Sequence, residues 1–314
     1  MATSQRQSLT TLILVSFLTF RLLALPLLRP GGYFGDWSDF AYYREFAALS
    51  LNGLFPYLHY WMEYPPIMPW LVVLLYQFTL GLPTFGHPLL WFQLTLGLLL
   101  ALADTVNLWL IVRIARKLSS GDPHLLTTDL RSAICYAGFF YPVFLLMMGF
   151  DGLALLCLLA MLDRALARAP GPAGVWCALG VLTKVFPLFA APAVLRFLPT
   201  WRDRLMFGGA AVGVGALVAA PLVAANPPMA LASLTGLLSR GSWQSVWAVL
   251  DGYYGPGLVA SLPDRLFYPP SASWSHPQRT GLLWLIVAAP LGLAALALVM
   301  RTAVTTSGLV RGSA

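Results

Sequence analysis

The sequence has 314 residues, of which 59% are hydrophobic and 10% charged, and its mean hydropathy is +0.75. One soluble core of this size cannot hide so much apolar surface, so the composition excludes an ordinary soluble domain. In a soluble chain the net charge of +7 would suggest nucleic-acid binding, but in a membrane protein it mainly reports topology. We therefore expect a membrane protein with membrane lipids around it and no nucleic-acid partner.

Several apolar stretches are long enough to cross the roughly 30 Å hydrocarbon layer, which takes about 20 residues of helix. The first of them lacks a following small-residue cleavage site, so we expect a retained helix and not a signal peptide. The predicted fold is all-α, a polytopic transmembrane helical bundle that forms one domain over residues 1–314. The expected spans are 9–28, 88–112, 132–148, 152–167, 174–184 with 187–198, 205–225 and 281–300.

Two parts of the chain do not fit a simple crossing. The stretch 65–88 has only about 15 apolar residues from Ile67, and a crossing there would place the basic run "RIARK" outside. We expect instead a short helix that dips into the outer leaflet and returns. The segments on either side of Lys184 should form a hairpin whose tip carries this lysine into the outer half of the membrane.

Charge sets the predicted orientation. With the N-terminus inside, the inner side receives 12 of the 19 basic residues and the outer side receives 7 of the 12 acids, which is a positive-inside bias. This predicts a multi-pass membrane protein with large extracytoplasmic loops at residues 29–66 and 226–280. The outer acids are Asp36, Asp39, Glu45, Glu63, Asp151, Asp251 and Asp264.

The first outer loop opens with "GDWSDFAYYREF", residues 35–46, and continues as an amphipathic pattern to Gly53. The pattern predicts a surface helix with Phe40, Tyr43, Phe46 and Ala47 on one face. Helix or turn capping explains the two aspartates of this motif as well as catalysis does. The loop, however, concentrates carboxylates, tyrosines and a histidine, which can serve as a general base and as hydrogen-bonding groups for a sugar or headgroup.

Polar groups at membrane depth are further candidates. Lys184, in "LTKVFP", is costly there and suits a lipid-linked phosphate, although snorkelling to the headgroups is the alternative. Asp104 and Asn107 lie one turn apart and favour interhelical hydrogen bonds. Arg21 is expected to snorkel outward or to pair with an outer acid, and Asp151 is placed to cap the helix that it opens.

Five motifs in this order resemble polytopic glycosyltransferases of the C superfamily. They are "GDWSDFAYY", "NGLFPYLHYWMEYPPIMPWL", "FFYPVFLLMMGFDGLALL", "LTKVFPLFAAPAVLRFLP" and "SRGSWQSVWAVLDGYYG". The chain is most similar to the GPI mannosyltransferase I type and its bacterial and archaeal relatives. The resemblance implies a polyprenyl-phosphate sugar donor, a lipid or glycan acceptor and an active site on the extracytoplasmic face of a prokaryotic plasma membrane.

Site residues follow from the resemblance one at a time. Asp39 matches the first-loop aspartate proposed as catalytic base, and Asp36 is the accessory acid of a spread Asp-x-x-Asp. The wide spacing puts a metal role in doubt, so no cofactor is assigned, while a divalent metal stays open. Among the predicted substrate-binding residues, Glu63, Tyr64, Asp151, Lys184 and Arg240 match family positions. Tyr43, His59 and Gln244 are added as neighbouring hydrogen-bonding groups without such a match.

The expected activity is therefore an inverting transfer of a hexose, with mannose implied by the resemblance. A lipid transporter or flippase and a catalytically silent scaffold subunit are the alternatives. A transporter would place charges along the bilayer midplane in matching halves, and only Asp104 fits that description. Family members usually continue for several more helices, so three explanations stay open: a truncated chain, a chain that needs a protein partner, or a compact variant.

Overall fold

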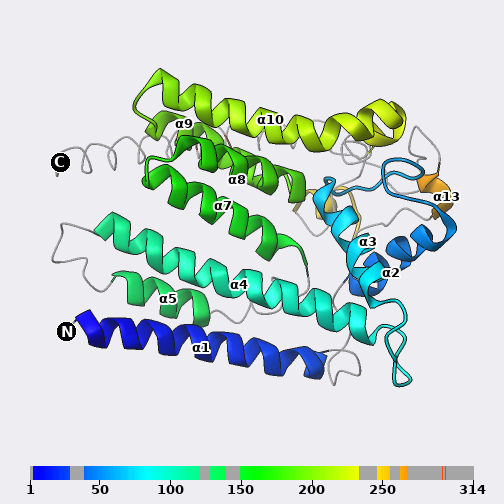
Figure 1. The fold of residues 1–314 in the computed structure, drawn as a ribbon, viewed down its shortest axis with the longest axis horizontal. Helices are drawn as coiled ribbons and strands as arrows, with labels where there is room; N and C mark the ends of the chain where they lie inside the picture. The colour runs from blue at the N-terminus through cyan, green and yellow to red at the C-terminus, as the bar shows by residue number, and fades with distance from the viewer. Residues whose placement is uncertain are drawn as a thin grey trace.

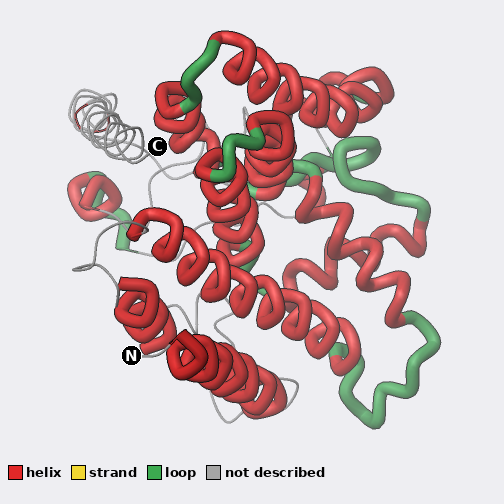
Figure 2. Tube along the Cα trace, turned by 60° about the vertical axis from the view of Figure 1, so that its left-hand side comes forward, coloured by secondary structure: helices red, strands yellow, loops and turns green. Residues whose placement is uncertain are grey.

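The fold was analysed in a computed structural model, which describes residues 3–28, 39–119, 128–138, 149–232, 246–254 and 262–266, with residues 292 and 294. Within these ranges every regular element is a helix, and the only bridge between extended residues is the isolated pair Pro56 and Tyr60. Figure 2 shows helices joined by loops throughout the described part of the chain. The all-α prediction is therefore confirmed.

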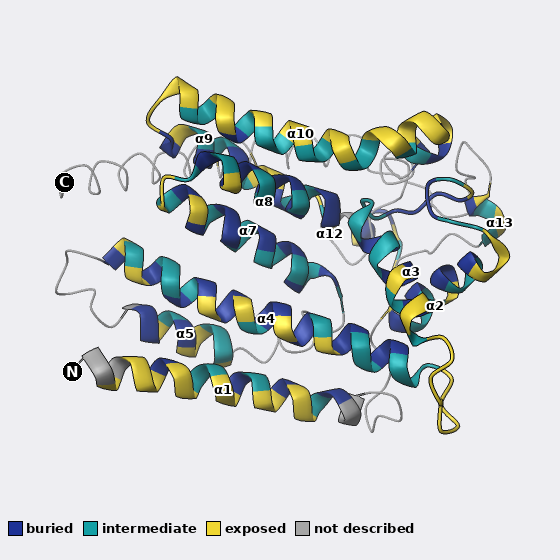
Figure 3. Ribbon diagram, in the orientation of Figure 1, coloured by how far each residue is buried: buried dark blue, intermediate teal, exposed yellow. Residues whose placement is uncertain are grey.

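Three described helices are long and apolar enough to cross a membrane: α1 (Thr3–Leu28), α4 (Leu90–Ser119) and α10 (Trp201–Ala225). Helix α10 buries only Phe207 against the protein and exposes large apolar side chains such as Leu217, which is 76% exposed. Helix α1 also presents exposed apolar residues along its length (Figure 3). Apolar surfaces of this extent need lipid around them, which supports the predicted membrane-protein character.

Shorter helices fill the space between the long ones. They are α5 (Thr128–Gly138), α7 (Asp151–Leu166), α8 (Pro170–Thr183), η3 (Phe186–Ala190) and α9 (Ala191–Phe197). Helix α8 packs against α7 and α10, and it ends at Lys184, whose φ of −158° and ψ of 139° are extended. Pro187 has no N–H to donate, so it cannot form the hydrogen bond that would continue α8. The chain therefore bends here and returns through η3 and α9. The predicted hairpin with Lys184 at its break is confirmed.

The amphipathic segment of the first loop forms α2 (Phe40–Ala48) followed by η1 (Leu49–Asn52). Its four buried residues are the predicted ones, Phe40, Tyr43, Phe46 and Ala47. Gly53 ends η1 with a φ of +71°, a conformation that glycine adopts without a Cβ clash. Both features of the predicted surface helix are confirmed.

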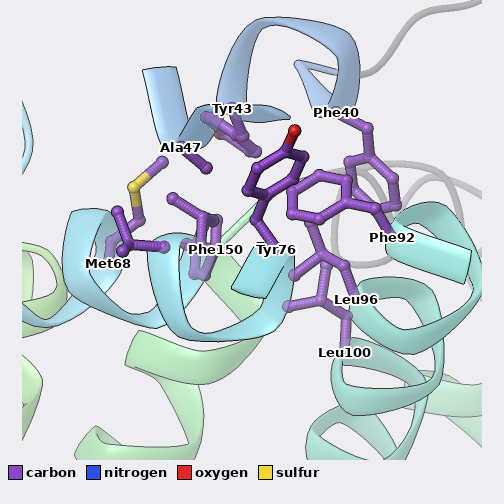
Figure 4. Packing of buried hydrophobic residues seen from close by; sticks show 11 residues of the cluster. Phe40, Tyr43, Ala47, Met68, Tyr76, Phe92, Leu96, Leu100 and Phe150 are labelled. Atoms are coloured by element: carbon purple, nitrogen blue, oxygen red, sulfur yellow. The ribbon is translucent and has the colours of Figure 1, made fainter. Parts of the chain in front are cut away.

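The expected dipping segment is α3 (Ile67–Thr79), a helix of 13 residues that begins directly after the paired prolines. It packs between α2 and α4. Figure 4 shows this core, in which Phe40 and Tyr43 of α2 meet Tyr76 of α3, Phe92 of α4 and Phe150. The short helix is confirmed, and its depth in a bilayer stays a prediction.

Several predicted boundaries were wrong, and the largest errors made helices too short. Helix α1 begins at Thr3 and not at residue 9, α4 continues to Ser119 and not to 112, and α10 begins at Trp201 and not at 205. Helices need not end where apolar sequence ends, because charged residues in their last turns are satisfied by ion pairs. The predicted span 281–300 lies outside the described residues apart from 292 and 294, and residues 139–148 of the span 132–148 also lie outside them.

A buried charge pair joins α1 to α4. Arg21 is 1% exposed and Asp104 fully buried, and the guanidinium Nε lies 2.6 Å from Oδ2 of the carboxylate. Tyr136 of α5 donates a hydrogen bond to the other carboxylate oxygen of Asp104, and Asn107 donates to the backbone oxygen of Gly152 at 2.8 Å. The interhelical role predicted for Asp104 and Asn107 is confirmed. Arg21 does not snorkel as expected, because this carboxylate offers it a partner at its own depth.

The C-terminal end of α4 is basic. Arg113 Nε and Lys117 Nζ lie 2.8 Å and 2.7 Å from Oδ1 of Asp163 on α7, and Arg116 Nε lies 2.7 Å from Oδ2 of Asp129 on α5. In Figure 1 this end of α4 lies at the left, while α2, α3 and α13 (Leu262–Arg265) lie at the right. The helices thus separate a basic end from an acidic end, and which end faces the cytoplasm stays a prediction.

The contact between α8 and α10 leaves no room for a side chain at Gly174. A Cβ atom built there would lie 2.2 Å from the backbone oxygen of Phe207 and 3.0 Å from Cβ of Ala210. We predict that Gly174→Ala separates the two helices and destabilises the protein by about 1–3 kcal/mol, the usual cost of overpacking. Thermal unfolding of the purified protein in detergent measures the loss.

Gly171→Ala is the matched control, since the position lies on the same helix and a Cβ there meets nothing within 4 Å. Alanine favours helix over glycine, so the unfolding temperature of this variant should stay unchanged or rise slightly. Equal destabilisation by both substitutions would show that the close approach at Gly174 does not limit helix packing.

Candidate functional site

The candidate site lies at the acidic end, where α2, α3 and the start of α7 meet (Figure 1). Helices α12 (Val246–Leu250) and α13 come from the second predicted outer loop. Trp61 of the first loop donates its backbone N–H to the oxygen of Arg265 at 3.1 Å and its indole N–H to the oxygen of Asp264 at 3.1 Å. The two predicted outer loops therefore contact each other at this end.

Asp39 occupies the N-cap position of α2, but its side chain accepts no capping hydrogen bond from the helix. The residue is exposed, and its Oδ2 accepts a hydrogen bond from Tyr43 Oη at 3.3 Å. This is long for an O–H to oxygen bond, and it orients the carboxylate toward Tyr43. Side-chain capping therefore does not explain Asp39, whose carboxylate is exposed at the start of α2.

Tyr43 is held rigidly under this carboxylate. Its ring meets Phe150 edge-on with centroids 5.2 Å apart, and Tyr64 edge-on at 6.0 Å. Burial, reinforced by the nearby Tyr64 and Asp39, raises the pKa of Tyr43 well above its ordinary value of 10.0. The phenol therefore stays protonated at physiological pH and acts only as a donor to Asp39.

Asp151 and Lys184 form an ion pair beside this group. Lys184 Nζ lies 2.6 Å from Asp151 Oδ1, and the two side chains are 38% and 43% exposed. Asp151 follows Phe150 directly and is the first helical residue of α7. Its expected capping role was wrong, because Phe150 holds the N-cap position and the Asp151 carboxylate turns toward Lys184. The structure brings together two residues that the sequence predicted separately.

Glu63 is buried and has both carboxylate oxygens occupied by protein groups. Tyr42 Oη donates to Oε1 at 2.7 Å, and Arg265 Nη1 pairs with Oε2. Burial alone would raise the pKa of Glu63, but the charge of Arg265 and these hydrogen bonds outweigh it and hold the pKa below its ordinary value. Glu63 was predicted to bind substrate, and in the structure it instead anchors Arg265.

Arg265 is the residue that sequence reasoning missed. It is fully buried, its guanidinium carbon lies 4.6 Å from the ring centre of Phe46 and 4.9 Å from that of Trp61, and Nη2 donates to Tyr42 Oη. The only local signal was a basic residue next to Asp264 in "SLPDRLF". Charge and aromatic contacts together fix α13 against α2.

The remaining predicted residues divide into two groups. His59 is exposed, and its Nδ1 accepts a hydrogen bond from the Phe55 N–H at 3.0 Å, which leaves Nε2 as the nitrogen that a ligand can use. Tyr64 is half-buried and its backbone oxygen accepts a hydrogen bond from Tyr57. The second group lies outside the described residues: Asp36, Arg240 and Gln244.

Metal ligation was left open by the sequence. In the described ranges no three His, Cys, Asp or Glu side chains gather as a group able to hold a metal ion. Asp36, the first aspartate of the spread Asp-x-x-Asp, lies outside those ranges.

Comparison of the chain with protein-family models, with curated proteins and with solved structures found no match.

We predict that Arg265→Met strongly destabilises the protein, because it leaves the Glu63 carboxylate buried without its cation. Breaking a buried pair in this way costs about 3–5 kcal/mol. Thermal or denaturant unfolding in detergent measures the loss. Glu45→Gln is the control, since Glu45 is an exposed carboxylate on the same helix, α2, and its neutralisation should change stability little.

The same pair predicts acid sensitivity. Because the folded pKa of Glu63 lies below the ordinary value of 4.5, its stabilising effect is complete above that value and is lost as the pH falls through the folded pKa. The double variant Glu63→Gln/Arg265→Met should be more stable than Arg265→Met, because it has no buried unpaired carboxylate. Its free energy of unfolding should also fall less than that of the wild type as the pH is lowered into the acid range. An equally steep fall in the double variant and the wild type would contradict the assignment of the acid sensitivity to Glu63.

Proposed function

We propose that this protein is a membrane glycosyltransferase that moves a hexose from a polyprenyl-phosphate donor to a hydroxyl of a lipid or glycan acceptor. The observation that carries the proposal is one continuous series of contacts. Asp39 accepts a hydrogen bond from Tyr43, Tyr43 packs on Phe150, and Phe150 precedes Asp151, which pairs with Lys184. An exposed carboxylate and an accessible ammonium group thus share one end of the helices.

The carboxylate suits the role of general base. Asp39 is exposed to an incoming acceptor, and Tyr43 fixes its orientation through a long hydrogen bond. In the proposed step Asp39 takes the proton of the acceptor hydroxyl while that oxygen attacks the anomeric carbon. The bond from this carbon to the phosphate oxygen breaks on the opposite face, and polyprenyl phosphate leaves with the electron pair. The product is inverted at the anomeric carbon, and the proton ends on Asp39.

The ammonium group suits the leaving phosphate. Lys184 has three N–H donors, of which Asp151 uses one, and its side chain is 38% exposed. A negatively charged phosphate at this position would gain a charge-assisted hydrogen bond that strengthens as the leaving oxygen acquires charge. The extended backbone at the break between α8 and η3 presents the lysine at this end of α8.

Arg265 and Glu63 act as positioning residues in this scheme. They hold Tyr42, and Tyr42 precedes Tyr43 on α2, so the buried pair fixes the rotation of the helix that carries Asp39. The pair contacts the protein and is not needed to contact the substrate. Tyr64 and His59 remain the proposed contacts to the sugar or acceptor, through a half-buried phenol and an exposed imidazole.

We predict that Asp39→Asn lowers transfer from a synthetic polyprenyl-phosphate hexose by about 100-fold or more, since general-base catalysis contributes roughly 10²–10⁴-fold. The amide keeps the shape of the side chain and removes its basicity. The assay follows sugar transfer to a panel of acceptors by the purified full chain, with thermal unfolding as the folding check. Glu45→Gln, an exposed acid on the same helix, should retain activity.

Full activity of Asp39→Asn would disprove the assigned base. No transfer by a well-folded wild-type protein with any donor of the panel would disprove the proposed function and favour a scaffold subunit. Movement of the lipid across the membrane without sugar transfer would favour a flippase.

We predict that Lys184→Gln raises the KM for the lipid donor about fivefold to tenfold, because one phosphate contact is lost. The half-exposed ion pair contributes little to stability, so the unfolding temperature should stay nearly constant. Asp151→Asn should lower the donor KM, since the carboxylate no longer competes with phosphate for Lys184. A donor KM that does not respond to Lys184→Gln would exclude this lysine from phosphate binding.

A further inference from the structure

A pocket lies at the basic end of the helices, away from the proposed active site. It encloses about 630 Å³ between α1 and α4. From α1 it is lined by Thr10, Thr11 and Leu14, and from α4 by Trp109, Arg113 and Lys117, among others. The pocket therefore lies between two of the three helices that are long and apolar enough to cross a membrane.

The lining changes from polar to apolar in one direction. Helix α1 begins at this end and α4 finishes here, so the two helices are antiparallel (Figure 1). Along α1 the lining runs from Gln7 inward to Leu14, about 10 Å, and along α4 from Lys117 inward to Trp109, about 12 Å. Both helices thus place charged or polar groups at the helix ends and apolar groups one to two turns inward.

Among the described residues in and beside the polar end of the pocket, cations outnumber carboxylates. Asp163 is shared by Arg113, Lys117 and Arg164, whose nitrogens lie 2.8 Å, 2.7 Å and 3.9 Å from its oxygens. A further cation, Arg116, pairs with Asp129 and also donates to Thr10 Oγ1 at 2.7 Å. Four cations therefore face two buried carboxylates.

Two of these cations remain accessible to a ligand. The side chain of Arg113 is 37% exposed and that of Lys117 is 27% exposed. Arg113 also lies over the Trp109 ring, with the guanidinium carbon 5.1 Å from the ring centre, which holds it at the polar rim. Arginine and lysine donors arranged in this way suit the oxygens of a phosphate diester.

We infer that this pocket binds the phosphate headgroup of an anionic membrane phospholipid. Arg113 and Lys117 would contact the phosphate, and the first part of an acyl chain would lie along Leu14 and Trp109. A soluble phosphate would use only the polar rim, whereas a lipid uses the whole gradient. A basic pocket between apolar helices is a recognised kind of lipid headgroup site. The inference is independent of the proposed sugar transfer.

Native mass spectrometry of the purified full chain tests this site. Detergent micelles are supplied with equal amounts of phosphatidylglycerol, which is anionic, and phosphatidylcholine, which is zwitterionic. We expect the wild-type protein to retain phosphatidylglycerol at least about fivefold more than phosphatidylcholine. Arg113→Gln and Lys117→Gln should each lower the retention of phosphatidylglycerol by about fivefold, the effect of one cation near a lipid headgroup.

Two features keep the test interpretable. Each single substitution leaves Asp163 paired with the other cation, so both variants should fold, and thermal unfolding with phosphatidylcholine alone checks this. Arg202→Gln is the matched control, because Arg202 is exposed in the first turn of α10 and does not line the pocket. It should retain phosphatidylglycerol as the wild type does.

Three results would overturn the inference. Equal retention of the two lipids by the wild-type protein would remove the headgroup preference. A loss of retention by Arg202→Gln as large as that by Arg113→Gln would show a general charge effect and no defined site. Displacement of phosphatidylglycerol by millimolar inorganic phosphate would assign the pocket to a soluble anion.

Discussion

The acidic end of this protein depends on one buried ion pair, between Glu63 and Arg265. The two residues are 202 positions apart in the chain, and both are almost completely shielded from solvent. Removing two charges from water is costly, and the cost is offset only by close geometry and further hydrogen bonds. Tyr42 supplies these bonds to both partners, and it belongs to α2. The pair therefore joins the two outer loops and orients the helix that carries Asp39.

Three other buried carboxylates in the described part of the chain follow the same rule. Asp104 is paired with Arg21, and Asp129 and Asp163 are paired with cations of α4. In an apolar protein an unpaired buried charge is strongly destabilising, so these acids are explained by structure alone. Asp39 differs, because its carboxylate is exposed and does not cap its helix. This contrast makes Asp39 the strongest candidate for chemistry.

The two ends of the bundle have opposite chemical characters, and the proposals use both. At one end an exposed carboxylate and the pair of Lys184 and Asp151 suit a reaction on a phosphate-linked sugar. At the other end the cations of α4 outnumber their carboxylate partners and border an apolar pocket. A lipid bound there would hold α1 against α4 beyond the contact that Arg21 and Asp104 already provide.

The sequence by itself determined the features that depend on local periodicity and on glycine and proline: the apolar helices, the buried face of α2, the end of η1 at Gly53 and the helix break at Lys184. A helix presents one face to its surroundings, so the spacing of apolar residues is enough to predict that face. Partner choice was decided only by the tertiary structure. Two ion pairs, Glu63 with Arg265 and Asp151 with Lys184, join residues far apart in the chain. No local pattern encodes such pairs, because a buried charge selects whichever opposite charge the packing of the helices brings to it.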